Sequence, residues 1–149
     1  MPTRYQGTEE ETRALNAYIK LQRAAETTLN RTTSYLSDYH LSTSQFAILE
    51  ALYHLGILSQ RTLAEKLLKS TGNISIVLKN MEKRELIERH RDPADNRYNQ
   101  VSITGIGREL IDSMFATHVA GIVLEMRILT FAEQEELGRL CRKLGLRKE

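Results

Sequence analysis

Two short stretches in the middle of the chain hold the side chains whose types and spacing could do chemistry. The first is "STGNISIVLKN", residues 70–80, in which small polar and basic residues recur at helical spacing. The second is "RDPADNR", residues 91–97, a charged turn with an arginine at each end. Hydroxyl, amide, ammonium and guanidinium groups in such positions can bind phosphates and the edges of bases.

The distribution of charge supports this interpretation better than the total charge does. The formal net charge is only +2, which by itself indicates no nucleic-acid partner. Residues 59–80, however, hold four basic side chains against one acidic side chain, whereas residues 109–137 hold six acidic against one basic. The basic character is therefore local to the middle of the chain.

The sequence contains no motif that indicates catalysis or metal binding. We find no glycine-rich phosphate loop, no metal-ligand spacing and no Ser/His/Asp or Cys/His arrangement set by a motif. The four histidines, His40, His54, His90 and His118, are scattered along the chain. The sequence thus predicts a protein that is no enzyme and that needs no metal or cofactor.

The single cysteine, Cys141, excludes an internal disulfide. It lies beside Leu137, Leu140 and Leu144 at helical spacing, which favours a small apolar side chain in a core or an interface. A redox role stays open, because neighbouring basic residues could stabilise a thiolate.

The length of 149 residues is typical of one compact domain. No run approaches 18 apolar residues, and the first residues lack the basic and apolar regions of a signal peptide. We therefore expect a cytoplasmic protein.

Periodicity and capping residues predict the elements that position the two stretches. We expect a long helix over residues 8–36, a helix beginning at Ser42 or Thr43, a short helix capped by Ser59 and a helix capped by Ser70 or Thr71. Two short strands with a turn at residues 92–96 follow, then a helix from Thr104 to about residue 129 and a last helix capped by Thr130.

The helix that starts near residue 70 has two different faces. Ile74, Val77, Leu78 and Met81 cluster on one side, and Gly72, Asn73, Ile76, Lys79, Asn80 and Lys83 cluster on the other. An apolar inner face therefore backs an outer face of small polar and basic residues. Ile76 lies in the middle of that outer face, where it suits contact with a thymine methyl group.

Two helices joined by a turn and followed by a hairpin form a winged helix-turn-helix. An α-helix fits the major groove of DNA, and a protruding hairpin can place a basic side chain in the next minor groove. We thus predict a mainly α fold with a small β-hairpin wing.

The sequence resembles the MarR family of bacterial transcriptional regulators over nearly its whole length. The resemblance rests on "LSTSQFAILEAL" (41–52), "SQRTLAEKL" (59–67), "STGNISIVLKNMEKRELIER" (70–89) and "RDPADNRYNQVSITGIGREL" (91–110), which occur in order and at family spacing. The most specific signature is Asp-x-Arg at the wing, followed by an alternating strand and Thr-x-x-Gly.

The resemblance implies a homodimer on a pseudo-palindromic operator in double-stranded DNA. It implies a winged helix lobe over about residues 38–103, with dimerisation helices over about 8–36 and 104–149, and a repressor released by small aromatic or phenolic effectors. The DNA-contacting residues would be Ser70, Thr71, Gly72, Asn73, Ser75, Ile76, Lys79 and Asn80 on the recognition helix and Arg91, Asp95 and Arg97 on the wing. Arg97 would enter the minor groove, and Asp95 would orient the wing.

Three positions depart from the pattern of the family. Asn96 stands where many relatives carry a second wing arginine, and Ile76 stands where many carry a basic residue. Glu85 stands where relatives usually have glycine. If the helix ends there in a left-handed conformation, a residue other than glycine destabilises the fold by on the order of 1 kcal/mol.

An effector pocket is expected near the junction of the first two helices. Its candidate residues are Tyr35, Tyr39, His40, Phe46 and Tyr53, although these aromatic side chains fit a core equally well. The alternative to operator binding is a winged helix that serves as a ligand-binding or protein-interaction module. Salt-dependent binding to promoter DNA would discriminate between the two.

Overall fold

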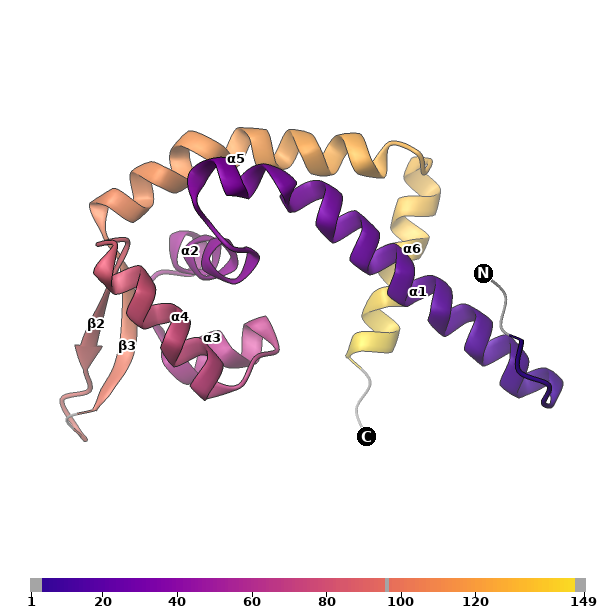
Figure 1. Ribbon diagram of the computed structural model, residues 1–149, viewed down its shortest axis with the longest axis horizontal. Helices are drawn as coiled ribbons and strands as arrows, with labels where there is room; N and C mark the ends of the chain where they lie inside the picture. Colours follow the sequence, from indigo (N-terminus) through magenta and orange to yellow (C-terminus); the bar gives the residue numbers. More distant parts are fainter. Residues whose placement is uncertain (1–3, 96, 147–149) are drawn as a thin grey trace. The chain divides into compact units, whose positions relative to one another are not determined.

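The computed structural model describes residues 4–95 and 97–146. Its elements are α1 (Glu9–Thr33), a 3-10 helix η1 (Ser34–Tyr39), α2 (Thr43–Leu55), β1 (Leu58–Ser59), α3 (Gln60–Leu67), α4 (Thr71–Lys83), β2 (Ile87–Arg91), β3 (Tyr98–Ile103), α5 (Gly105–Met126) and α6 (Phe131–Gly145). Figure 1 shows α3 and α4 beside the β2–β3 hairpin. The predicted mainly α fold with a hairpin wing is confirmed.

The helices begin where the sequence places hydroxyl side chains. The Oγ atoms of Ser42, Ser59 and Ser70 accept the backbone N–H three residues ahead, at 3.0–3.1 Å. Thr130 caps α6 in the same way, and the carboxylate of Glu133 bonds back to the Thr130 backbone N–H at 2.8 Å. These contacts satisfy backbone donors that a helix start leaves unpaired, and they confirm the predicted caps.

The first helix ends earlier than predicted. Periodicity carries it to about Leu36, but α1 stops at Thr33 and the chain tightens into the 3-10 helix. Leu36 is 2% exposed and belongs to the apolar core that follows. The tighter turn brings Leu36 into that core, and the segment ends at His40 in a left-handed conformation (φ 53°).

The sheet has three strands in the order β1–β3–β2, all antiparallel. The hairpin of β2 and β3 was predicted, but β1 was not. β1 is only two residues long, with Leu58 opposite Val101 and Ser59 opposite Gln100. A strand of this length has no periodicity of its own, so only its pairing with β3 defines it.

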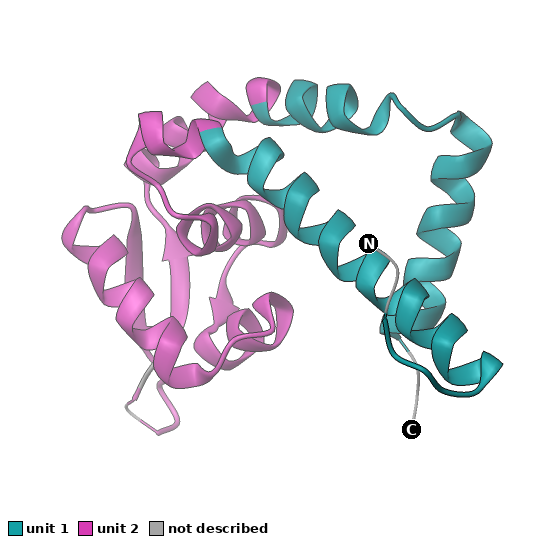
Figure 2. Ribbon diagram, turned by 45° about the vertical axis from the view of Figure 1, so that its right-hand side comes forward, with its two compact units in different colours: residues 1–34, 118–149 teal, residues 35–117 magenta. Residues whose placement is uncertain are grey.

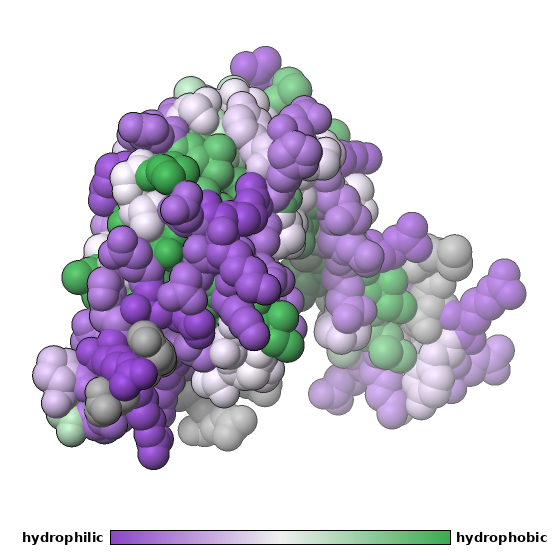
Figure 3. Space-filling model, turned by 60° about the vertical axis from the view of Figure 1, so that its left-hand side comes forward, coloured by the Kyte–Doolittle hydropathy of each residue, from purple (hydrophilic) through white to green (hydrophobic). Residues whose placement is uncertain are grey.

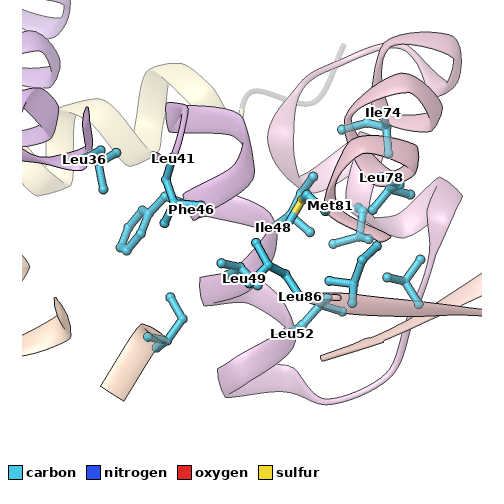
Figure 4. Packing of buried hydrophobic residues seen from close by; sticks show 14 of the residues in the cluster. Leu36, Leu41, Phe46, Ile48, Leu49, Leu52, Ile74, Leu78, Met81 and Leu86 are labelled. Carbon is cyan, nitrogen blue, oxygen red and sulfur yellow. The ribbon is translucent and has the colours of Figure 1, made fainter. Parts of the chain in front are cut away.

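One apolar core holds the helix-turn-helix and the wing together. Its buried members come from η1, α2, α3, α4, β2, β3 and α5 and from the connections that contain Leu41 and Leu86. Figure 4 shows Leu49 and Leu52 of α2 near Leu86. Ile74, Leu78 and Met81 on the inner face of α4 are 0% exposed. Because these side chains are fixed in the core, the opposite face of α4 must point to solvent.

The Thr-x-x-Gly signature has a structural explanation. The Thr104 hydroxyl donates to the carbonyl oxygen of Glu85 at 2.6 Å and accepts the backbone N–H of Gly107 at 3.0 Å. A Cβ atom at position 107 would lie 2.2 Å from the carbonyl oxygen of Leu86. The pair therefore joins the start of α5 to the chain just before β2, and position 107 needs glycine for this close approach.

Glu85, at the position where relatives usually have glycine, adopts a left-handed conformation with φ 58°. Replacing it by glycine should stabilise the fold by about 0.5–1 kcal/mol, since glycine has no Cβ penalty in this region. Urea unfolding of Glu85→Gly would measure the gain. Glu85→Ala is the matched control, because it removes the side chain but keeps the Cβ atom; an equal gain in both variants would contradict the backbone explanation.

Contacts divide the chain into two compact units, which Figure 2 colours separately. Unit 1 comprises residues 1–34 and 118–149, and unit 2 comprises residues 35–117. All buried apolar residues of the core cluster, from Leu36 to Met114, lie in unit 2. Within residues 4–95 and 97–146 no single helix is long and apolar enough to cross a membrane, although α5 and α6, bent by 101° at their connection, pass that test as a pair.

Candidate nucleic-acid interface

The outer face of α4 is the surface that the sequence analysis assigned to DNA. Gly72, Asn73, Lys79 and Asn80 are exposed, Ser75 is half-buried and Ile76 is 68% exposed. The buried side chains of the same helix lie on the other side. The structure therefore places five of the predicted residues on one solvent-facing strip, namely Gly72, Asn73, Ile76, Lys79 and Asn80, with Ser75 at its side.

The start of α4 is fixed by contacts that also involve predicted interface residues. Ser70 is exposed, but its Oγ atom is bonded to the N–H of Asn73, so it serves as a helix cap. The side-chain amide of Gln60 in α3 donates to the carbonyl oxygen of Thr71 at 3.4 Å. Gly72 has open space around it, since a Cβ atom there would meet nothing within 4 Å. Packing within the protein therefore does not require glycine at this position.

Backbone hydrogen bonds shape the tip of the wing. The Asp92 N–H donates to the carbonyl oxygen of Arg97 at 2.7 Å, and the Asp92 carboxylate accepts the N–H of Ala94 at 2.7 Å. The Asp95 carboxylate accepts the N–H of Arg97 at 3.0 Å. Asp95 thus holds the backbone of Arg97, while the Arg97 side chain is exposed. Such Asx contacts are common in turns.

Arg91 is exposed at the end of β2, opposite Tyr98 and just after an irregularity between His90 and Arg91. Asn96, the position where many relatives carry a second arginine, lies outside the described residues. Asp92 shapes the turn as much as Asp95 does, although the sequence analysis gave it no part in the site.

An ion pair missed by the sequence analysis connects α4 to the wing. Nε and Nη2 of Arg89 in β2 lie 3.0 and 2.8 Å from Oε2 of Glu82 in the last turn of α4. The side chain of Arg89 is only 20% exposed. A signal was available, because Arg89 comes two residues after the buried Ile87 and therefore lies on the same face of β2. A charged residue on the inner side of a strand needs a partner. The pair helps to fix the wing relative to α4.

Exposed basic side chains lie on α4 and on the part of the chain just before it. Lys66 in the last turn of α3, Lys69 two residues after the end of that helix and Lys79 on α4 are exposed, whereas Arg61 is paired with Glu65 at 3.1 Å. Figure 3, which brings the side of α4 and the wing forward, shows a mostly hydrophilic surface with isolated hydrophobic spots. The arrangement can attract a polyanion and present hydrogen-bonding groups to it.

Tyr35 and Tyr39, two of the expected pocket residues, lie together. Their rings meet edge to face with centroids 6.1 Å apart, and both pack against the core. Burial is the main cause that raises the pKa of Tyr35 to about 12, so its phenol stays neutral at physiological pH. Phe46, 4% exposed, is a member of the core itself. His40 is exposed, and its carbonyl oxygen accepts a bond from Arg84 at 2.6 Å.

Tyr53, the fifth expected pocket residue, takes part in a polar cluster. Its hydroxyl donates to the Asp112 carboxylate at 2.5 Å, and the guanidinium carbon of Arg108 lies 5.1 Å from the centre of its ring. The bond to Asp112 raises the pKa of the Tyr53 phenol. His54 and Phe115 stack edge to face beside it, with centroids 5.2 Å apart. The sequence analysis predicted neither Arg108 nor Asp112 as part of this region.

Metal binding finds no support in the part of the chain that the structure describes. There, no three His, Cys, Asp or Glu side chains come together to hold an ion. His118 is buried, at 8% exposure, and Cys141 is exposed on α6.

The sequence model of the MarR family matches residues 41–98, from just before α2 to the start of β3. The chain is 33% identical to the uncharacterised HTH-type transcriptional regulator YwaE of Bacillus subtilis over 132 residues, which cover 89% of this chain and 75% of that protein. It is 29% identical to the HTH-type transcriptional regulator MhqR of the same organism, over 90% of this chain and 92% of MhqR.

A solved structure shares both fold and sequence with the chain. It is BpsR of Bordetella bronchiseptica, a protein whose DNA binding is described as regulated by 6-hydroxynicotinic acid. The TM-score is 0.79 at 25% identity, and the match covers 87% of this chain and 98% of BpsR.

Proposed function

The chain belongs to the MarR family of DNA-binding transcriptional regulators, and from this premise we propose that it is a ligand-responsive homodimeric repressor of a pseudo-palindromic operator. It is a regulator and not an enzyme. One observation carries the proposal: the exposed polar and basic strip of α4 and the arginine-bearing wing belong to the same packed unit. A repressor of this kind works in the bacterial cytoplasm, where the chromosome lies.

In the proposed complex, α4 enters the major groove of each half-site and the wing reaches the neighbouring minor groove. The residues assigned to bases and phosphates are Ser70, Thr71, Gly72, Asn73, Ser75, Ile76, Lys79 and Asn80, with Arg91, Asp95 and Arg97 on the wing. The open space around Gly72 supports a close approach of the DNA backbone to the start of α4. The Glu82–Arg89 pair holds the two DNA-contacting elements in a fixed arrangement.

A homodimer is supported by the composition of unit 1. No described residue of α1 or α6 is buried. On α6, the apolar side chains of Leu137, Leu140 and Leu144 are exposed on one face. The second half of α5 exposes Val119, Ile122 and Val123. Exposed apolar side chains grouped in this way on two helices are typical of an interface. A dimer also matches the requirement of two half-sites about 34–36 Å apart.

The salt dependence of DNA binding tests the proposed function. The protein should bind promoter DNA of its own locus with an affinity that falls steeply as salt rises, because phosphate contacts release counterions. Lys79→Ala should weaken binding to all DNA similarly and lower the salt slope by about 1 for each phosphate that is no longer neutralised. Fluorescence anisotropy at several salt concentrations measures both quantities.

The matched control is Lys20→Ala, a substitution at an exposed position of α1. It should leave the affinity and the salt slope unchanged. Absence of binding at every promoter, or binding without salt dependence, would favour the alternative of a ligand-binding or protein-interaction module.

The proposed effector is a small aromatic or phenolic molecule, in line with the aromatic acid that regulates BpsR. It would bind near Tyr35, Tyr39, His40, Phe46 and Tyr53. Binding would favour a non-matching state of the dimer, in which the distance between the two recognition helices differs from the distance between the two half-sites. Such a ligand releases DNA only to the extent that it binds the non-matching state more tightly. The cationic Arg108 beside Tyr53 offers charge complementarity to an aromatic carboxylate.

We expect a binding aromatic acid to raise the melting temperature of the protein and to weaken operator binding. A thermal-shift screen of hydroxylated aromatic acids, followed by anisotropy with operator DNA, measures the two effects. Arg108→Gln should reduce the response to a carboxylate more than to its neutral amide analogue. Equal responses to the two analogues in the unmodified protein would contradict a role for the Arg108 cation.

A further inference from the structure

Ile76 is an exception among the aliphatic residues of α4. Ile74, Leu78 and Met81 are 0% exposed and Val77 is half-buried, whereas Ile76 is 68% exposed. It lies on the outer strip, one turn after Asn73 and one turn before Lys79 and Asn80. The strip that the proposed function places in the major groove therefore has an aliphatic side chain at its centre.

A single exposed isoleucine is unremarkable on a protein surface, but its surroundings change once α4 enters a groove. Most groups on the floor of the major groove are hydrogen-bond donors and acceptors, and an aliphatic side chain pressed against them would cost their desolvation. The apolar group that the groove offers is the C5 methyl of thymine. Ile76 can thus be buried favourably only against that methyl.

The neighbours of Ile76 are consistent with the same kind of base pair. The side chains of Asn73 and Asn80 are exposed on either side of it along the helix. Asparagine amides pair with the N6 and N7 atoms of adenine. Arginine and lysine can read guanine, but α4 contains no arginine, and Lys79 is assigned here to a phosphate contact. The strip combines an apolar group suited to thymine with amides suited to adenine.

We propose that Ile76 is a specificity-determining residue that selects thymine through its C5 methyl, in the middle of an A·T-containing half-site. This inference rests on the proposed function, because it requires that α4 lie in the major groove. It adds the chemical identity of the recognised base and the residue that reads it.

The test compares thymine with deoxyuridine, which has the same hydrogen-bonding groups but no methyl. Duplexes are first selected from a random pool by the unmodified protein and then synthesised with either base. Burial of one methyl corresponds to about a fourfold change in affinity, so the unmodified dimer should prefer the thymine duplex by about 15-fold over two half-sites. Ile76→Ala should lose most of the preference because its side chain is shorter, and Ile76→Val should retain a larger part of it.

Lys79→Ala is the matched control on the same strip. It should weaken binding to both duplexes and keep the preference for thymine. Equal affinity of the unmodified protein for both duplexes, or an undiminished preference in Ile76→Ala, would overturn the inference while leaving DNA binding intact. Failure to select any duplex would overturn the proposed function as well. Far-UV circular dichroism should show that the variants keep their helices, since the side chain of Ile76 is outside the core.

Discussion

Replacing Arg97 by alanine is expected to weaken operator binding by about 1–3 kcal/mol, with the free energy of unfolding unchanged. The Arg97 side chain is exposed, so its removal leaves no cavity in the core. The Asp95 carboxylate bonds to the backbone N–H of residue 97, and this contact survives the substitution. The loss should therefore come from the contact with DNA, where an arginine in a narrow minor groove meets a strongly negative potential.

Fluorescence anisotropy with operator DNA measures the affinity, and urea unfolding measures the free energy of unfolding. Arg97→Lys keeps the charge but loses the planar guanidinium, so it should recover only part of the affinity. The loss is expected to be large because Asn96 provides no second wing arginine. A fall in stability without a fall in affinity would show that Arg97 is structural and would reverse its assignment.

The second large effect is expected from Leu140→Glu on α6. Leu140 is 47% exposed and shares a face with Leu137 and Leu144, so a carboxylate there should prevent the proposed dimer from forming. A monomer binds only one half-site at a time. Without the effective concentration that links the two sites, apparent operator affinity should fall by roughly 10²- to 10⁴-fold.

Sedimentation equilibrium gives the mass of the variant, and anisotropy gives its affinity. The core of unit 2 lies within residues 36–114, so the helix-turn-helix should stay folded. Arg142→Glu is the matched control, since it places the same carboxylate at an exposed position on the opposite side of α6. A Leu140→Glu protein that stays dimeric would place the interface elsewhere, and a monomer with unchanged affinity would contradict cooperative binding to two half-sites.

The sequence was sufficient to predict the exposed strip of α4 and the turn of the wing, the surface that we propose faces DNA. The inner and outer faces of α4 follow from helical spacing, and the hydroxyl side chains predicted Ser70 or Thr71 as its cap, of which Ser70 is the one observed. The turn of the wing follows from its Pro, Asp and Asn residues. These features depend on residues only a few positions apart, so the sequence carries them directly.

Contacts within unit 2 between residues distant in the sequence were decided by the tertiary structure. Strand β1 exists only through its pairing with β3, about 40 residues later, and the early end of α1 depends on where Leu36 packs. The Thr104 hydroxyl ties α5 to Glu85, and Arg89 pairs with Glu82. Tyr53 could be predicted as an aromatic residue of the second helix, but its partners Asp112 and Arg108 could not.

Except for the end of α1, the sequence by itself thus determined where the α-helices lie and which hydroxyl residues could cap them. It also determined the turn of the wing and the polar strip of α4, because each is encoded by local spacing and local hydrogen bonding. The tertiary structure alone decided which aromatic residues enter the core, which charges pair and how the wing is fixed to the recognition helix. Those choices depend on side chains that meet only after the chain has folded, and no local pattern specifies such partners.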